Sequence, residues 1–220
     1  MMITRRDANV SLLSTIVVAA VPGLAMAQSQ AMELPPPQTE GGKPLMEALK
    51  ARHSSREFAD RPLAPQVLSN LLWAAWGINR PETGLRTAPS SGGKMDIDLY
   101  LAMADGVWIY DPKTNRLLQH MPDDVRGETT TGQAYVKTAP LNIIYVSDAA
   151  RMGQPSDAAR TFNGIADSAV IGQNVYLFCA SEGLATVIRA SVPGERLAKR
   201  LNLTPTQAIY LAQSVGYPKT

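Results

Sequence analysis

Cysteine and histidine are scarce in this chain of 220 residues. Cys179 is the only cysteine, so the chain can form no internal disulfide and no multi-cysteine metal site. His53 and His120 are the only histidines, so a zinc site would have to take most of its ligands from carboxylates. We therefore expect no bound metal.

Charge of one sign is lacking as well. The sequence holds 21 Lys and Arg against 19 Asp and Glu, a net charge of +2, and no stretch concentrates the positive charge. Nucleic-acid-binding proteins usually carry a clustered basic face, so we expect no nucleic-acid partner. With 45% hydrophobic and 18% charged residues, the composition predicts a well-packed globular domain and argues against a disordered tail or a coiled coil.

The first 27 residues have the pattern of a secretory signal peptide. Arg5 and Arg6 precede an apolar stretch at 10–24, and Ala25-Met26-Ala27 provides a small-x-small cleavage site. The apolar stretch is short and contains Ser, Thr, Pro and Gly, which argues against an uncleaved membrane anchor. Thr4-Arg5-Arg6 partly resembles the twin-arginine export signal, and the ordinary route for unfolded chains stays open.

These signals divide the chain into three parts. After the signal peptide at 1–27, residues 28–43 contain three consecutive prolines and two glycines and are expected to form a linker. Residues 44–220 are expected to form the domain. The protein should accordingly be exported to the periplasm.

Hydrophobic periodicity predicts an α+β domain. Helical spacing is found at 44–52, 66–76, 162–182 and 193–201. Strand patterns are found at 97–103, 107–110, 116–119, 141–146, 184–188 and 208–215. Turn signals between successive strands favour a mostly antiparallel sheet flanked by helices. The helix at 162–182 is apolar nearly all round, so we expect it to be buried in the core or between two subunits.

Two short segments carry groups suited to a polar ligand. Arg52 and Arg56 lie four residues apart with Ser54 between them, an arrangement that can bind a phosphate, although basic residues are also common at helix ends. The run from Pro89 to Gly93 offers backbone N–H groups and small hydroxyls that suit the edge of a flat polar ring, although it also fits an ordinary loop.

Two other motif readings are weaker. Ser91-Gly92-Gly93-Lys94 fits the S-x-x-K motif of penicillin-binding proteins and serine β-lactamases, which makes a hydrolase one alternative, but two glycines oppose the helix that this motif requires. The chain has no G-x-G-x-x-G run, so no Rossmann dinucleotide site is indicated.

Four motifs together resemble the nitroreductase family of FMN-dependent oxidoreductases. They are Arg52–Phe58, Leu71–Asn79, Arg86–Gly92 and Gln173–Leu177 followed by Ser181–Leu184. The resemblance covers about residues 44–218 and is closest to the branch that includes azoline-oxidising dehydrogenases of modified-peptide biosynthesis. It implies two FMN sites at the interface of a homodimer, with the long helix at that interface.

The resemblance also implies roles for particular residues. Arg52, His53 and Ser54 would surround the phosphate, and Arg56 would reach the ribityl chain or the pyrimidine edge. The remaining candidates are Pro89, Ser90 and Ser91 on the ring from the partner subunit, Ala190 and Ser191 beside flavin N5 and O4, and Lys219 in place of the family's basic C-terminal tail.

The expected function is that of an exported FMN-dependent oxidoreductase acting through flavin N5 on a small acceptor such as a nitro compound or a quinone. The flavin supplies the redox chemistry, so no single side chain is expected to be catalytic. Most relatives use NAD(P)H; export would favour a quinol, an electron-transfer protein or the substrate itself as donor. The alternative is a non-catalytic flavin-binding protein, a carrier or sensor.

Overall fold

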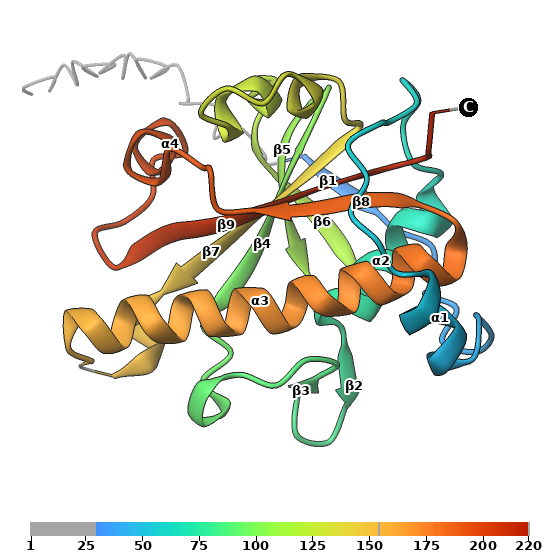
Figure 1. Ribbon diagram of the computed structural model, residues 1–220. Helices are drawn as coiled ribbons and strands as arrows, with labels where there is room; N and C mark the ends of the chain where they lie inside the picture. Colours follow the sequence, from blue (N-terminus) through green and yellow to red (C-terminus); the bar gives the residue numbers. More distant parts are fainter. Residues whose placement is uncertain (1–29, 154, 220) are drawn as a thin grey trace, which may run out of the picture.

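The computed structural model describes residues 30–153 and 155–219 (Figure 1). Its helices are α1 (Leu45–Ala51), α2 (Pro65–Trp76), α3 (Asp157–Glu182) and α4 (Gly194–Arg200). Its strands are β1 (Ala31–Glu33), β2 (Ile78–Arg80), β3 (Leu85–Arg86), β4 (Ile97–Met103), β5 (Gly106–Asp111), β6 (Arg116–Met121), β7 (Leu141–Asp148), β8 (Ala185–Arg189) and β9 (Gln207–Gly216).

Seven of these strands form one sheet in the order β1-β6-β5-β4-β7-β9-β8, and β2 and β3 form a separate hairpin. Each neighbouring pair in the large sheet is antiparallel. Helix α3 runs along one face of the sheet, as Figure 1 shows. The predicted α+β class, with a mostly antiparallel sheet flanked by helices, is confirmed.

The long helix begins five residues before its predicted start at 162. Ser156 caps it by accepting a hydrogen bond from the Ala159 amide, and Asp157 adds a negative charge in the first turn, where the helix dipole favours one. Gly183 ends the helix in the left-handed region at a φ of 71°. A polar cap ahead of the apolar pattern accounts for the missed turn.

The segment expected to be a linker is extended but attached to the domain. Strand β1 pairs with β6, and Leu34 is buried. The carbonyl of Pro35 accepts hydrogen bonds from Ser69 Oγ at 2.5 Å and from Asn115 Nδ2 at 2.9 Å. Residues 31–35 are therefore part of the folded unit.

The predicted signal peptide lies outside the described residues. Among residues 30–153 and 155–219, no helix is both long enough and apolar enough to cross a membrane.

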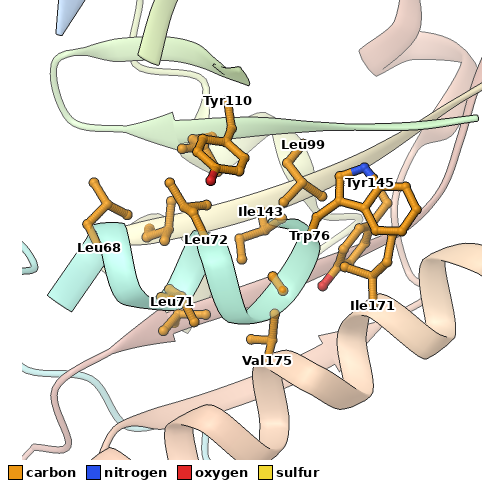
Figure 2. Close-up of a cluster of buried hydrophobic side chains, with 14 of the residues drawn as sticks. Leu68, Leu71, Leu72, Trp76, Leu99, Tyr110, Ile143, Tyr145, Ile171 and Val175 are labelled. Atoms are coloured by element: carbon orange, nitrogen blue, oxygen red, sulfur yellow. The ribbon is translucent and has the colours of Figure 1, made fainter. Parts of the chain in front are cut away.

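The main hydrophobic core lies between the sheet, α2 and α3 (Figure 2). Leu72 and Trp76 of α2 meet Ile143 of β7 and Ile171 of α3 there, and all four are almost completely buried. Burying each such side chain contributes about 1.5–3 kcal/mol. Cys179 is also buried, and burial raises the pKa of its thiol, as expected for a packing residue without reactivity. This core fixes α3 against the sheet and so sets the frame for the site.

Candidate functional site

The segment from Arg52 to Arg56 lies against α3 and the edge strand β8. The Ser55 amide donates to the Thr186 carbonyl at 2.9 Å. The Arg52 guanidinium carbon lies 5.3 Å from the centre of the Tyr176 ring, a distance at which a cation is attracted to the ring face. His53, Ser54 and Arg56 are exposed. The structure thus gathers basic and hydroxyl side chains at an accessible surface beside α3.

Tyr176 connects this segment to β8. Its hydroxyl lies 2.8 Å from Ser54 Oγ and accepts a hydrogen bond from the Ile188 amide at 3.0 Å. The sequence places Tyr176 in the long helix and in the Gln173–Leu177 motif, without a role at the site. The available signal was its phenol, because a mostly buried tyrosine usually finds a partner for its hydroxyl.

A pocket of about 290 Å³ lies beyond Tyr176, between α3 and the end of β8. Ala169, Gly172 and Gln173 of α3 line one side, and Ile188, Arg189, Ala190 and Leu211 line the other. A Cβ on Gly172 would lie 2.5 Å from Ile188 Cδ1, so only glycine lets the helix approach β8 this closely. Ala190 is exposed and Ser191 half-buried directly after β8. The Arg52 segment, Tyr176 and this pocket therefore form one continuous surface.

The C-terminus reaches the same surface. The Ala59 amide donates to the Tyr217 carbonyl at 2.9 Å, and the Lys219 amide donates to the Glu57 carbonyl at 3.4 Å. Lys219 is exposed. The structure thus brings Lys219 beside Glu57, the residue that follows the Arg52–Arg56 segment.

Pro89, Ser90 and Ser91 lie on a different side of α3. The Ser91 amide donates to the two carboxylate oxygens of Asp167 at 2.8 and 3.0 Å, and the Ser91 hydroxyl donates to Asp167 at 2.8 Å. Asp167 and Tyr176 are nine positions apart on α3, which at 3.6 residues per turn places them on opposite sides and about 13 Å apart along the axis. One chain therefore does not bring this loop together with the Arg52 segment.

The same contacts bear on the hydrolase alternative. Ser91 begins a single 3₁₀ turn, in which Gly92 has a φ of 59°, instead of an α-helix. Its hydroxyl donates to the Asp167 carboxylate, and Lys94 is exposed. This geometry does not match a serine activated by a lysine three residues later.

Buried polar groups lie beneath the pocket. Tyr145 Oη donates to Gln213 Oε1 at 2.7 Å, and Gln213 Nε2 donates to Thr186 Oγ1 at 2.9 Å. The buried Arg189 guanidinium donates to Thr129 and Asn142, and burial lowers the Arg189 pKa to about 10. A buried network of this kind holds β7, β8 and β9 in register below the site.

Other features carry none of the predicted site residues. A larger apolar cavity of about 390 Å³ is lined by β1, the segment at 60–68 and the β4–β5 turn. His120 is half-buried, with Nε2 2.7 Å from the Leu201 carbonyl oxygen. Within the part of the chain that the structure describes, no group of three His, Cys, Asp or Glu side chains could hold a metal ion.

Comparison with known proteins identifies the family. The model of the nitroreductase family matches residues 49–217. A nitroreductase-type protein from Methanocaldococcus jannaschii is 30% identical over 166 residues, which cover 71% of this chain and 82% of that protein. The chain therefore belongs to the nitroreductase family, a family of oxidoreductases.

Solved structures agree with this assignment. The crystal structure of a nitroreductase-type protein from Ralstonia eutropha superposes with a TM-score of 0.83 at 36% identity, covering 88% of this chain and 92% of that one. The NADPH:FMN oxidoreductase from Vibrio harveyi, solved with NAD⁺, gives a TM-score of 0.60 at 20% identity, covering 80% of this chain and 69% of that one. The second likeness shows the fold alone.

Proposed function

We propose that this protein is an FMN-dependent oxidoreductase that passes hydride or electrons through the flavin to a small organic acceptor such as a nitro compound or a quinone. One observation carries the proposal. The Tyr176 hydroxyl joins the basic Arg52–Ser54 segment to the backbone of β8, so that a phosphate-binding surface and an apolar pocket are parts of one groove.

The residues present fit FMN. Arg52 and Lys219 supply positive charge at one end of the groove, and Ser54 supplies a hydroxyl, which together suit a phosphate. The walls of the pocket beside Gly172 and Ile188 are mostly apolar, which suits one face of a planar ring.

Each part of this groove would have a simple task. Bound FMN supplies the hydride and electron transfer that side chains cannot perform. Arg52 and Ser54 would bind its phosphate while Tyr176 holds Ser54 in position. The backbone amides of Ala190 and Ser191 would donate hydrogen bonds to the ring, and Arg56 would supply positive charge near its pyrimidine edge.

We further propose that the working unit is a homodimer. Phe162, Ile165 and Val170 are 71%, 41% and 39% exposed on α3, and Leu45, Met46 and Leu49 of the neighbouring α1 are exposed too. Exposed large apolar side chains on α3 and α1 favour an interaction with a second copy. A second copy seated there would let Pro89, Ser90 and Ser91 of one subunit complete the groove of the other.

The electron donor and the location are proposals of the same kind. NAD(P)H would serve as donor if the mature protein stays in the cytosol. Export by the sequence at 1–27 would instead favour a quinol or an electron-transfer protein, because nicotinamide coenzymes are not expected in quantity outside the cytoplasm. Fractionating cells that express the full chain, followed by intact-mass measurement of the product, decides this: a periplasmic product that begins at residue 28 supports export.

The direct test is an absorption spectrum of the purified protein, before and after addition of FMN and gel filtration. We expect bound flavin. A protein that stays colourless after FMN addition would reject the proposal. Turnover of a nitroaromatic or a quinone, with NADH, NADPH and a reduced quinone compared as donors, then separates the enzyme from the non-catalytic flavin-binding alternative.

A further inference from the structure

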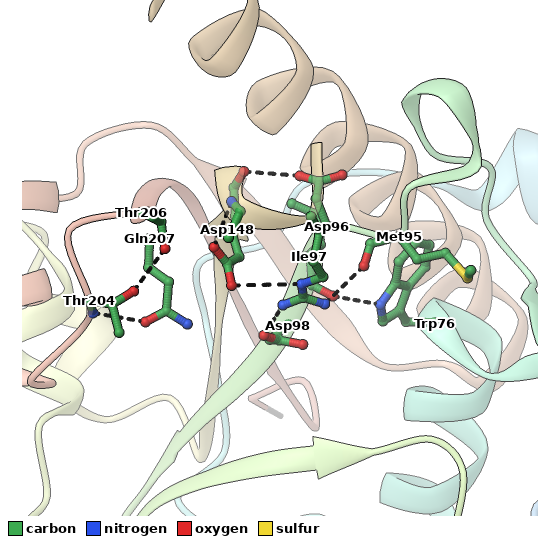
Figure 3. A network of polar contacts seen from close by, with 12 residues as sticks. Trp76, Met95, Asp96, Ile97, Asp98, Asp148, Thr204, Thr206 and Gln207 are labelled. Atoms are coloured by element: carbon green, nitrogen blue, oxygen red, sulfur yellow. Dashed lines mark hydrogen bonds and ion pairs between the residues drawn. The ribbon is translucent and has the colours of Figure 1, made fainter. Parts of the chain in front are cut away.

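The side chains of Asp96 and Asp167 lie within hydrogen-bonding reach of each other behind the loop that carries Pro89, Ser90 and Ser91. Asp96 directly precedes β4 and lies next to Ile97 in Figure 3. Both residues are completely buried. Asp167 of α3 is 4% exposed. Ser147 of β7 donates to Asp96 Oδ2 at 3.0 Å, while Asp96 Oδ1 has no hydrogen-bond partner among the protein groups described.

Asp167 is the anchor of the loop. Its two oxygens accept every bond that attaches Ser91 to α3, from the amide and from the hydroxyl. Within the loop, the Met95 amide donates to Ser90 Oγ at 2.7 Å, so the turn between Ser90 and Met95 is closed on itself. Asp167 therefore attaches the Ser91 end of the turn to α3, while the Met95 carbonyl at the other end accepts a hydrogen bond from Arg151 Nη1 at 2.9 Å.

Helix α3 approaches Ser147 of β7 closely at Gly164. A Cβ on Gly164 would lie 2.8 Å from Ser147 Oγ, the same hydroxyl that donates to Asp96. Helix α3 therefore packs tightly against β7 beside Asp96. Two carboxylates held together in a dry site repel each other strongly unless one of them keeps a proton.

We propose that Asp96 and Asp167 are positioning residues, an acid and a carboxylate sharing one proton, which hold the Ser90–Met95 turn in place for flavin binding and loosen it when the proton is lost. The role of the pair in flavin binding rests on the proposed function. With the proton present, the Asp96 acid donates to Asp167, and Asp167 still accepts from Ser91. Without it, the two negative charges push Asp167 away from its position.

The titration supports this direction. Burial, and to a smaller extent hydrogen bonding with Asp167, raises the pKa of Asp96 to about 6. The proton is therefore held below pH 6 and lost above it. The other charged residues on β4, β7, α3 and the turns beside them are Lys94, Asp98, Asp105, Asp148, Arg151, Asp157, Arg160 and Glu182. Arg151 pairs with Asp98 and Asp148, and among charged neighbours only Asp167 contributes to the Asp96 shift.

The first experiment needs no flavin. Hydrogen exchange of the amides at 88–95 is measured in the full chain between pH 5 and pH 8 and corrected for the intrinsic rate at each pH. In the unsubstituted protein we expect protection of these amides to fall by about fivefold or more across that range. Asp96→Asn keeps a permanent donor toward Asp167 and should hold the high protection at every pH. Protection independent of pH in the unsubstituted protein would overturn the proposal.

Two further variants sharpen this result. Asp167→Asn removes the carboxylate that anchors Ser91, so protection should be low at every pH. Asp157→Asn, an exposed aspartate of the same helix, should behave like the unsubstituted protein. Loss of protection in Asp96→Asn, or a pH response abolished by Asp157→Asn, would count against the pair.

The second experiment measures the FMN dissociation constant over the same range. It should rise about fivefold or more from pH 5 to pH 8 in the unsubstituted protein and stay constant in Asp96→Asn. A rise of equal size in both proteins overturns the role of the pair in flavin binding. Failure of every variant to bind FMN at any pH rejects the proposed function together with that role, while the exchange result still decides whether the pair anchors the loop.

Discussion

The two sides of α3 hold their neighbours by different chemistry. On the Tyr176 side, a neutral hydroxyl links Ser54 to the Ile188 amide beside an apolar pocket. On the Asp167 side, a buried carboxylate holds the Ser91 loop next to a second buried carboxyl group. The first contact involves hydroxyl and amide groups, whereas burial raises the pKa of the Asp96 carboxyl on the second side to about 6. Variants on the first side should therefore change ligand affinity at any pH, and variants on the second should change how the protein responds to pH.

The largest effect on FMN affinity should come from separating the two subunits of the proposed dimer. Ile165→Glu puts a charge among the exposed apolar residues of α3 and should convert the dimer to a monomer. FMN affinity should then fall by about 100-fold or more, because the loop from the second subunit is lost. Light scattering after size exclusion, combined with FMN titration, measures both. Leu118→Glu is the matched control. Leu118 is 38% exposed on β6, which lies at the opposite side of the sheet from β8 and β9, the strands next to α3. A monomeric unsubstituted protein that binds FMN tightly contradicts this prediction.

The Asp96–Asp167 pair should make the free energy of unfolding depend on pH. The pKa of Asp96 is about 6 in the folded chain against an ordinary value of 3.8, so the folded state keeps a proton that the unfolded state has lost between these values. Stability of the unsubstituted protein should fall as the pH rises through this window, by about 3 kcal/mol in all. Asp96→Asn should remove this fall and be the more stable protein at pH 8. Urea denaturation at pH 4.5, 6 and 8 measures it, and parallel curves for the two proteins would contradict the prediction.

Removing the guanidinium beside Tyr176 should weaken FMN binding by about 1.5–3 kcal/mol, the scale of a lost charged hydrogen bond. The variant is Arg52→Ala, and titration calorimetry or flavin fluorescence measures the change. Arg196→Ala, an exposed arginine of α4, is the control and should leave affinity unchanged. Unchanged affinity in Arg52→Ala rejects the phosphate role.

The smallest effect should follow from removing one hydroxyl. Tyr176→Phe keeps the ring under Arg52 and loses the bonds to Ser54 and to the Ile188 amide, so FMN affinity should fall by about 1 kcal/mol at every pH. Tyr210→Phe, which alters a half-buried tyrosine on β9, is the control. A loss that appears only above pH 6 would contradict the division between the two sides of α3.

Most of the helices and strands could be predicted because the sequence patterns that indicate them are local. The pattern of β7 is rich in apolar and β-branched residues, and that of α2 ends before Gly77, so each element can be recognised from its own sequence. Arg52 and Ser54 were selected for the same reason, since their charge and spacing are visible in seven consecutive letters. The structure then placed both beside Tyr176.

The missed features are contacts between distant parts of the chain. Nothing around Tyr176 or Asp167 in the sequence indicates that one meets Ser54 and the other Ser91, because those contacts follow from how α3 lies on the sheet. Strand β1 was read as linker because it is three residues long and precedes three prolines, and its pairing depends on β6, more than eighty residues later. Such strands have too short a pattern to be recognised alone.

The two ends of the large sheet have one further consequence, which concerns aggregation. Unpaired strand edges are templates for pairing with another chain. Here β1 covers the β6 edge, and the Ser55 amide bonds to the β8 edge. Both covers come from the chain before α2, although the rest of the sheet comes after it. A fragment that begins at α2 would keep nearly all of the core and leave both edges bare, so it should self-associate through strand pairing while retaining most of its native secondary structure.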